Sequence, residues 1–238
     1  MNIEIIFENE NYLVVDKPAG VLVHPTAAGE TDTLVSWLIN KYPNIDKLAW
    51  PDATRPGIVH RLDKDTSGLI ILAKNPETLE RLQKLFKERE VQKTYQTLVA
   101  GHCPDQGKID IPIVRDSQKD MMSTRSLTFS FSRGTAREAF TEYKTIARYK
   151  YKKEDLSLVE VYPHTGRMHQ IRVHMKHEGY PVIGDQMYFN KPSKRLSKEL
   201  GLNRQFLHAV KLEIDSQVFT SNLADDLKLI LDKLKVAV

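Results

Sequence analysis

The sequence predicts an α+β protein built on a mixed, mostly antiparallel central sheet with flanking helices. Short apolar segments of strand type outnumber the segments with helical periodicity. Most strand segments are followed by a turn and another strand, so hairpin neighbours outnumber βαβ crossovers. With 238 residues the chain is long enough to bury a substantial core. We therefore expect a single domain of residues 1–238, formed of two lobes.

The chain opens with an expected hairpin and a short helix. Residues 3–7 and 12–15 are apolar runs on either side of a Glu-Asn-Glu-Asn turn. Residues 34–39 are expected to form a helix, because potential capping residues precede them and Pro43 follows them. Strand signals begin within the first residues, so we expect no separate domain ahead of the central sheet.

The middle of the chain contains a helix, a strand and a polar segment. Asn75 followed by Pro76 is typical of a helix start, and apolar residues then recur at helical spacing up to Phe86. That stripe indicates a core-facing helix. A strand over 91–99 follows, and residues 115–137 are polar and irregular, which fits a solvated loop or the tip of a hairpin.

The last hundred residues are expected to contain three more strands and two helices. Thr165 and Gly166 are suited to cap a helix running from about Arg167 to Lys176. Such a helix would set His169, Arg172 and Lys176 along one face. The other expected elements are strands over 139–146, 156–162 and 206–214 and a terminal helix from residue 223.

Composition limits the class of protein. The net charge of +4 and the pI near 9.0 fit nucleic-acid binding without demanding it. Cys103 is the single cysteine, so an internal disulfide and a zinc-type cysteine pair are excluded and a reducing compartment is the default. Without a signal sequence or a long apolar run, the cytoplasm is the expected location and no membrane partner is expected.

The most informative stretch is the charged loop from His60 to Gly68. The apolar residues Ile58 and Val59 lead into this loop and a β-branched run leaves it, so the core is expected to anchor both ends. Within the loop, Asp63 is flanked by three residues that we expect to act as cations: His60, Arg61 and Lys64. Positive charges favour the ionised carboxylate and attract a polyanion.

This loop resembles the H-R-L-D-x-x-[ST]-S-G signature of the RluA family of RNA pseudouridine synthases. Further family landmarks occur in order: Lys17-Pro18-Ala19-Gly20, Lys93-Thr94-Tyr95, Pro112-Ile113, His164-Thr165-Gly166-Arg167-Met168-His169-Gln170-Ile171-Arg172-Val173-His174, Gly184-Asp185 and Phe206-Leu207-His208-Ala209. The resemblance spans almost the whole chain, with Met168 standing where most relatives carry Thr. It implies the pseudouridine synthase fold, divided by an RNA-binding cleft. Several branches of the family carry a small RNA-binding domain before this fold, but here the strand signals begin at once, so no separate N-terminal RNA-binding domain is expected.

The resemblance also implies a reaction and its residues. Pseudouridine formation breaks the bond from C1′ to N1 of uridine, rotates the uracil and rejoins C1′ to C5, without a cofactor. By resemblance, Asp63 is the catalytic carboxylate, Arg167 its ion-pair partner, and Tyr95 the aromatic platform or proton acceptor. Ile171 is expected to form an apolar wall. A carboxylate of this kind acts as a nucleophile or a base.

RNA contacts are expected from basic residues near these positions. Arg61 resembles the family residue that enters the RNA beside the flipped base, an event that costs a few kcal/mol of unstacking. The other expected RNA-binding residues are His60, Lys64, His169 and Arg172, and the basic residues Lys119, Arg125, Arg133 and Arg137 make the segment 115–137 a further candidate. Large-subunit ribosomal RNA is the first expected substrate and transfer RNA the second, with the protein acting as a monomer.

Rival interpretations of the same residues remain. The histidines at 164, 169 and 174 could hold a metal, but steps of five rotate each ligand away from the last, so no metal is expected. Asp65 could pair with Asp63 in a glycosidase, although the neighbouring cations would keep both acids ionised. Arg61 could simply pair with Asp65. A non-catalytic RNA-binding or RNA-folding factor is the alternative from another class.

Overall fold

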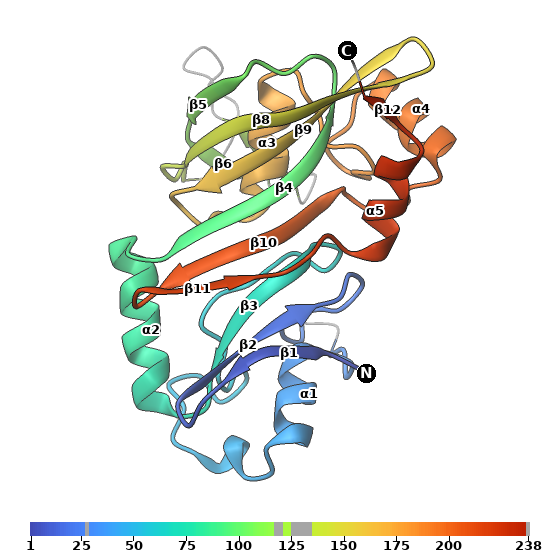
Figure 1. Ribbon diagram of the computed structural model, residues 1–238. Helices are drawn as coiled ribbons and strands as arrows, with labels where there is room; N and C mark the ends of the chain where they lie inside the picture. The colour runs from blue at the N-terminus through green and yellow to red at the C-terminus, as the bar shows by residue number, and fades with distance from the viewer. Residues whose placement is uncertain (27–28, 117–120, 125–134, 237–238) are drawn as a thin grey trace. The chain divides into compact units, whose positions relative to one another are not determined.

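The computed structural model describes residues 1–26, 29–116, 121–124 and 135–236 (Figure 1). Strands paired into an antiparallel sheet, with helices beside them, confirm the predicted α+β class. The chain forms two compact units, each with its own internal packing. Unit 1 consists of Met1–Gln92 and Ala209–Ala224, and unit 2 consists of Lys93–His208 and Asp225–Val238.

The sheet of unit 1 is built on the predicted hairpin. Its strands are β1 (Glu4–Glu8), β2 (Tyr12–Lys17), β3 (Ser67–Ala73), β10 (Leu207–Ile214) and β11 (Gln217–Thr220), in the order β1-β2-β3-β10 with β11 on β10. β2 is antiparallel to both neighbours, with Val14 opposite Ile71. All seven residues of β3 are buried, so this strand is the centre of the core of unit 1.

The helices of unit 1 begin where their capping residues predict. α1 (Leu34–Lys41) has Thr33 as its N-cap in a capping box with Ser36. α2 (Pro76–Glu88) begins after Asn75, whose side chain accepts a hydrogen bond from the N–H of Thr78. A short 3-10 helix, η1 (Ile45–Lys47), lies between them in the sequence. Both helices therefore confirm the expectations, since each ends within two residues of its predicted bound.

The sheet of unit 2 has long strands at its centre. β4 (Gln92–Ala100) pairs with β9 (Glu154–Pro163), and β9 pairs with β8 (Phe140–Tyr151). β5 (Gln106–Asp110) and the short β12 (Lys235–Val236) both pair with β8. Both β8 and β9 are longer than the strands expected over 139–146 and 156–162, and they include most of the residues between those ranges. The connection can be this short because Lys152 takes a left-handed conformation, which permits a tight turn.

A second, two-stranded sheet lies in the segment 115–137 and just before it. β6 (Ile113–Asp116) pairs with β7 (Met121–Thr124) in antiparallel register. This pairing supports the hairpin interpretation for the described part of the segment. Of the basic residues named above, Lys119, Arg125 and Arg133 lie outside the described residues.

Three helices complete unit 2, and one of them begins later than predicted. α4 (Lys191–Leu200) and α5 (Asp225–Asp232) follow in the chain after α3 (Gln170–His177). We expected α3 to begin near Arg167 with a cap at Thr165-Gly166. Instead its N-cap is His169, in a left-handed conformation with φ of 56°. His169 therefore precedes the helix and does not share a helical face with Arg172 and Lys176.

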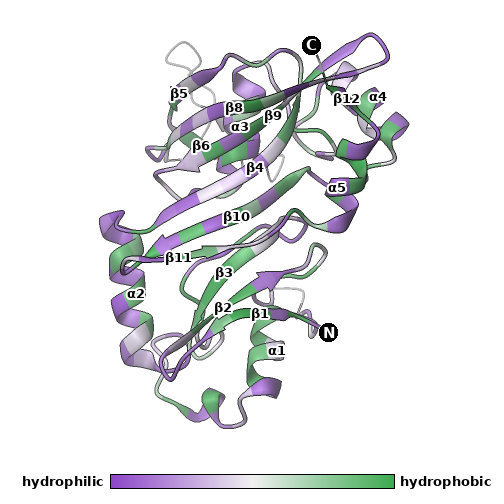
Figure 2. Cartoon of the chain, viewed as in Figure 1, coloured by the Kyte–Doolittle hydropathy of each residue, from purple (hydrophilic) through white to green (hydrophobic). Residues whose placement is uncertain are grey.

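Hydropathy follows burial along the strands. Figure 2 shows that β2 and β3 are hydrophobic over most of their length, and the buried side chains of unit 1 include Leu13, Ile70 and Leu82. In unit 2 the buried side chains include Leu98 and Val161, on the paired strands β4 and β9. Among the helices that the structure describes, none has the length and apolar character needed to cross a membrane.

Candidate active site

The loop that carries Asp63 is anchored to β3 at both of its ends. Before the loop, Ile58 forms an antiparallel bridge with Leu72, and the N–H of Ala73 donates to the carbonyl of Gly57 at 2.9 Å. After the loop, the chain enters β3 directly at Ser67. The loop therefore begins and ends on the same buried strand, as the flanking apolar residues predicted.

His60 fixes the loop from within. The Nε2 atom of His60 accepts a hydrogen bond from the N–H of Ile71 at 3.2 Å, and its ring stacks on Phe86 with centroids 4.5 Å apart. An imidazole nitrogen that accepts a hydrogen bond carries no proton. His60 is therefore a neutral structural residue here, which corrects the expectation that it is a cation beside Asp63. Phe86, expected only as core, supports this loop.

Asp63 lies half-buried at the start of a tight turn. The N–H of Thr66 donates to the carbonyl of Asp63 at 3.1 Å, which closes the turn, and the side chain of Lys64 is exposed. Gly68 follows with φ of +111°, and a Cβ there would lie 2.4 Å from the carbonyl oxygen of Ala209. Only glycine allows this close approach of β10, so the end of the loop packs directly on the backbone of that strand.

Lys17 supports the turn from below the surface, a role that sequence reasoning did not assign. Its side chain is fully buried at the end of β2, and Nζ donates to the carbonyls of Pro18, Val21 and Lys64 at 2.8, 2.9 and 3.0 Å. The N–H of Gly20 donates to the same Lys64 carbonyl. The ammonium thus ties two loops together next to Asp63. Its presence in a family landmark was the available signal.

Arg61 is exposed on the same loop and contacts a buried histidine. Its Nη1 atom lies 3.4 Å from Nε2 of His24, and Nδ1 of His24 lies 2.9 Å from the carbonyl oxygen of Pro25. The polar contact of Arg61 is thus with His24, instead of the pairing with Asp65 that we considered. A cation two residues from Asp63 is held in place on the protein before any RNA arrives.

Unit 2 contains the expected tyrosine. Tyr95 lies on β4 opposite Val161 of β9, and only 8% of its surface is exposed. Its neighbour in the same family landmark is Lys93, and burial lowers the pKa of Lys93 to about 8. A nearly buried aromatic ring on a central strand has a fixed position, which is what a stacking platform requires.

The segment before α3 places Arg167 and Ile171. The N–H of Arg167 donates to Oε1 of Gln170 at 3.0 Å, and its Nε donates to the carbonyl of Glu138 at 2.9 Å. Arg167 is therefore half-exposed on an irregular turn, with one edge of its guanidinium already bonded. Ile171 lies in the first turn of α3 and is buried, consistent with an apolar wall.

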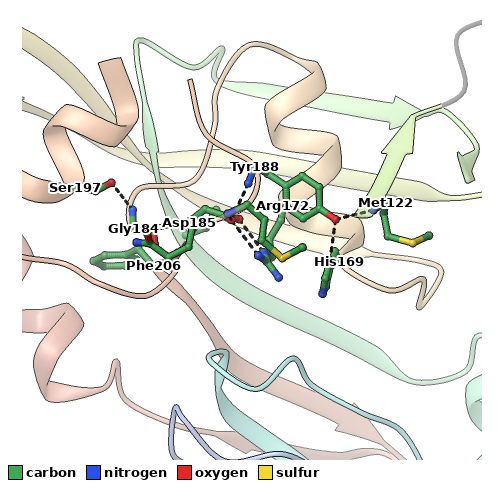
Figure 3. A network of polar contacts seen from close by, with 11 residues as sticks. Met122, His169, Arg172, Gly184, Asp185, Tyr188, Ser197 and Phe206 are labelled. Atoms are coloured by element: carbon green, nitrogen blue, oxygen red, sulfur yellow. Dashed lines mark hydrogen bonds and ion pairs between the residues drawn. The ribbon is translucent and has the colours of Figure 1, made fainter. Parts of the chain in front are cut away.

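Arg172 lies in the interior of unit 2, which corrects the expectation that it contacts RNA. Its side chain is 5% exposed, and Nε and Nη2 donate to the two carboxylate oxygens of Asp185 at 2.7 and 2.9 Å (Figure 3). Burial alone would raise the pKa of Asp185, but the hydrogen bonds and charge of Arg172 lower the pKa below its ordinary value. A guanidinium held in this way does not reach a surface phosphate.

The same network extends to His169 and β7. The N–H groups of Met187 and Tyr188 donate to Asp185, and the hydroxyl of Tyr188 accepts from the N–H of Met122 at 2.8 Å. That hydroxyl is also 2.9 Å from Nδ1 of His169 (Figure 3). The half-exposed His169 and Met122 of β7 therefore share one anchor, the hydroxyl of the buried Tyr188.

The remaining histidines of this motif have structural partners. His174 is buried, with Nδ1 2.9 Å from the hydroxyl of Thr141 and Nε2 3.0 Å from the carbonyl of Ile111, and burial lowers the pKa of His174 below its ordinary value. His164 pairs with Glu142 at the surface. Across the residues that the structure describes, no group of His, Cys, Asp or Glu has the arrangement of a metal site.

Comparison with known proteins gives the family. The family model described as RNA pseudouridylate synthase matches residues 11–177. This chain belongs to that family. The matched range contains Asp63, Tyr95 and Arg167. Several relatives are named ribosomal large subunit pseudouridine synthase D, which confirms the resemblance to the RluA family.

Individual RNA pseudouridine synthases support this assignment. A protein of Chloroflexus aurantiacus described as an uncharacterised RNA pseudouridine synthase is 40% identical over 92% of this chain, and 66% of that relative is covered. The ribosomal large subunit pseudouridine synthase D of Zymomonas mobilis is 36% identical over 99% of this chain and 74% of its own length. The chain thus spans about two thirds to three quarters of these relatives.

Solved structures of the family share the fold. The human RNA pseudouridylate synthase domain containing 1 matches with a TM-score of 0.75 and 26% identity, covering 100% of this chain and 89% of its own. The human RNA pseudouridylate synthase domain containing 4 matches with a TM-score of 0.74 and 25% identity, covering 99% and 94%. Both likenesses confirm the predicted pseudouridine synthase fold.

Proposed function

We propose that this chain isomerises specific uridines to pseudouridine in structured RNA, with large-subunit ribosomal RNA as the first candidate substrate. The observation that carries the proposal is the fixed loop presenting the half-buried Asp63 inside the complete family signature. Relatives named for the ribosomal large subunit support the choice of RNA. Transfer RNA is the second candidate.

The proposed chemistry needs one carboxylate and no redox step. Asp63 attacks C1′ of the target uridine, or removes the C2′ proton, and the bond from C1′ to N1 breaks. The detached uracil rotates and C5 bonds to C1′, which releases the Asp63 carboxylate in the first route and is accompanied by return of the C2′ proton in the second. The proton on C5 then leaves, and N1 ends protonated. Both routes use the same carboxylate in its ionised form, so a fixed and charged Asp63 serves either.

Other residues of the family motifs are assigned supporting roles. By the family resemblance, Tyr95 is the platform for the detached base or accepts the C5 proton, Ile171 is the apolar wall, and Arg167 keeps Asp63 ionised. Two observations support these roles: the ring of Tyr95 and the side chain of Ile171 are both held by burial. The buried Arg172, oriented by Asp185, is the alternative cation of the same motif.

RNA binding is assigned to exposed basic residues of the two units. Arg61 and Lys64 are exposed on the Asp63 loop, and His169 is half-exposed before α3. Arg61 is proposed to enter the RNA beside the flipped nucleotide. His60, bonded to Ile71 and stacked on Phe86, supports the loop instead of binding a phosphate as a cation. A cytoplasmic monomer is the proposed working form.

Release of tritium from uridine labelled at C5 tests the reaction. The substrates are unmodified large-subunit ribosomal RNA, bulk transfer RNA and free uridine, with Asp63→Asn as the inactive control. Release from one RNA class, absent in Asp63→Asn, establishes the isomerase and names its substrate class. Tritium release that persists in a clean Asp63→Asn preparation would show that Asp63 is not the catalytic carboxylate.

The alternative from another class, a non-catalytic RNA-binding or RNA-folding factor, predicts binding without release. RNA affinity measured at increasing salt separates the possibilities, because several phosphate contacts make affinity fall steeply with salt. Salt-sensitive binding with no tritium release from any RNA favours the non-catalytic factor. A flat salt dependence argues against an electrostatic RNA interface of either kind.

A further inference from the structure

The contact between His24 and Arg61 fixes the protonation of the histidine. A carbonyl oxygen only accepts hydrogen bonds and a guanidinium only donates them. The Nδ1 atom of His24 must therefore donate to Pro25, and its Nε2 atom must accept from Arg61. His24 is thus a neutral imidazole whose single proton lies on Nδ1. This tautomer satisfies both ring nitrogens of a side chain that is only 7% exposed.

The backbone that carries His24 is itself held on two sides. The N–H groups of Leu34 and Val35, at the start of α1, donate to the carbonyls of Leu22 and Val23 at 2.8 and 3.1 Å. A few residues earlier, the carbonyl of Val21 accepts from the ammonium of Lys17. His24 is therefore a rigid acceptor, placed by α1 and by the same lysine that supports the Asp63 turn.

We propose that His24 is a positioning residue that holds the guanidinium of Arg61 ready to enter the RNA. This inference rests on the proposed function, in which Arg61 contacts the RNA beside the flipped uridine. A free arginine side chain loses much rotamer freedom on binding, and ordering it beforehand lowers that cost. His24 in turn retains Arg61, since its buried Nε2 would otherwise be an acceptor without a donor.

A double-mutant cycle separates this role from simple packing. The variants are His24→Leu, His24→Gln, Arg61→Ala and the combinations of each histidine change with Arg61→Ala. Glutamine can place an acceptor oxygen near the position of Nε2, whereas leucine cannot. The readouts are kcat/KM for tritium release from the RNA that the wild-type protein modifies, RNA affinity, and thermal unfolding of each variant.

The proposal predicts a loss that depends on Arg61. His24→Leu should lower kcat/KM by roughly tenfold, because a hydrogen bond to a charged group is lost. In the Arg61→Ala background the same change should have no further effect, because the group that it positions is already gone. His24→Gln should restore most of the activity.

An equal loss in both backgrounds would overturn the proposal, because it would show that His24 acts through packing alone. If His24→Leu does not unfold cooperatively, His24→Asn takes its place, since asparagine is polar but too short to reach Arg61. Failure of the proposed function has a different signature: the wild-type protein would release no tritium from any RNA. RNA affinity then replaces kcat/KM as the readout of the cycle. A His24→Leu effect on affinity that disappears in the Arg61→Ala background supports the positioning role, and an equal effect in both backgrounds overturns it.

Discussion

The ammonium of Lys17 donates a hydrogen bond to the main-chain carbonyl of Lys64, at 3.0 Å, one residue after the proposed catalytic Asp63. The two lysines at this turn differ in burial. Lys17 is fully buried and bonded to backbone carbonyls, whereas the side chain of Lys64 is exposed. The loop that presents Asp63 is therefore supported by a cation from β2, and stability and activity should be linked at this point.

The first prediction concerns Lys17. Lys17→Met removes the donor that three part-buried carbonyls share, so the free energy of unfolding should fall by about 2–4 kcal/mol. Turnover should fall as well, because the Asp63 turn loses its support. Lys64→Met is the matched control and should change stability by less than about 0.5 kcal/mol, since its side chain is exposed. Urea unfolding measures both; equal effects of the two changes would contradict the supporting role.

The second prediction separates the two acids of the loop. Asp63→Asn should lower tritium release by at least about 1,000-fold, because an amide cannot act as nucleophile or base. Asp65→Asn, the matched control, should retain turnover within a few-fold. A similar loss in both variants would instead indicate the paired-carboxylate chemistry that we considered from the sequence.

The third prediction tests Arg167 as the proposed ion-pair partner of Asp63. Arg167→Ala should lower turnover by roughly tenfold to a hundredfold, and Arg167→Lys by less, because lysine retains the charge. Wild-type turnover in both variants would exclude Arg167 and make Arg172 the next cation to test.

The fourth prediction concerns the buried pair of Arg172 and Asp185. Arg172→Met leaves a buried carboxylate without its cation, so the free energy of unfolding should fall by about 3–5 kcal/mol at pH 7. The lowered pKa of Asp185 means that the pair stabilises the fold above the ordinary carboxyl pKa and loses this effect as pH falls. The difference from wild type should therefore shrink only as pH falls below the ordinary carboxyl pKa of 3.8.

The exposed pair of Lys152 and Glu199 supplies the control for this fourth prediction. Lys152→Met should change stability by less than about 1 kcal/mol, because exposed ion pairs contribute little. Urea unfolding at pH 7 and at lower pH measures both variants. A loss for Arg172→Met that is no larger than the control would show that the buried pair does not hold the unit together.

The fifth prediction uses the lowered pKa of Lys93. With a pKa of about 8 in the folded protein against an ordinary value of 10.5, the unfolded chain binds more protons between these values. The penalty for burying the charged form is thus complete below pH 8 and disappears as pH rises toward 10.5. Lys93→Met should raise the free energy of unfolding by about 2 kcal/mol at pH 7 and by much less at pH 10.

Lys87→Met, on the exposed side of α2, is the control for the Lys93 experiment. Its effect on urea unfolding should be small and the same at both values of pH. A gain for Lys93→Met that does not change with pH would mean that added apolar packing, and not the loss of a buried charge, stabilises the variant.

Local signals in the sequence determined the class of fold and most of its elements. The caps at Thr33 and Asn75 and the apolar runs of β1 and β2 act between residues close in the chain, so a pattern is enough to predict them. The family signature likewise pointed to Asp63 and Tyr95 as candidate site residues, and the single cysteine excluded an internal disulfide.

Only the tertiary structure decided what several charged and polar side chains do. Lys17 contacts the carbonyl of Lys64, 47 residues away in the sequence, and His24 contacts Arg61, 37 residues away. No local sequence pattern predicts either contact. The same is true of Arg172, which a sequence pattern placed at the surface and Asp185 holds in the interior. Whether a cationic side chain is buried or exposed depends on the partners that tertiary packing places next to it, because burial of a charge without a partner costs too much free energy.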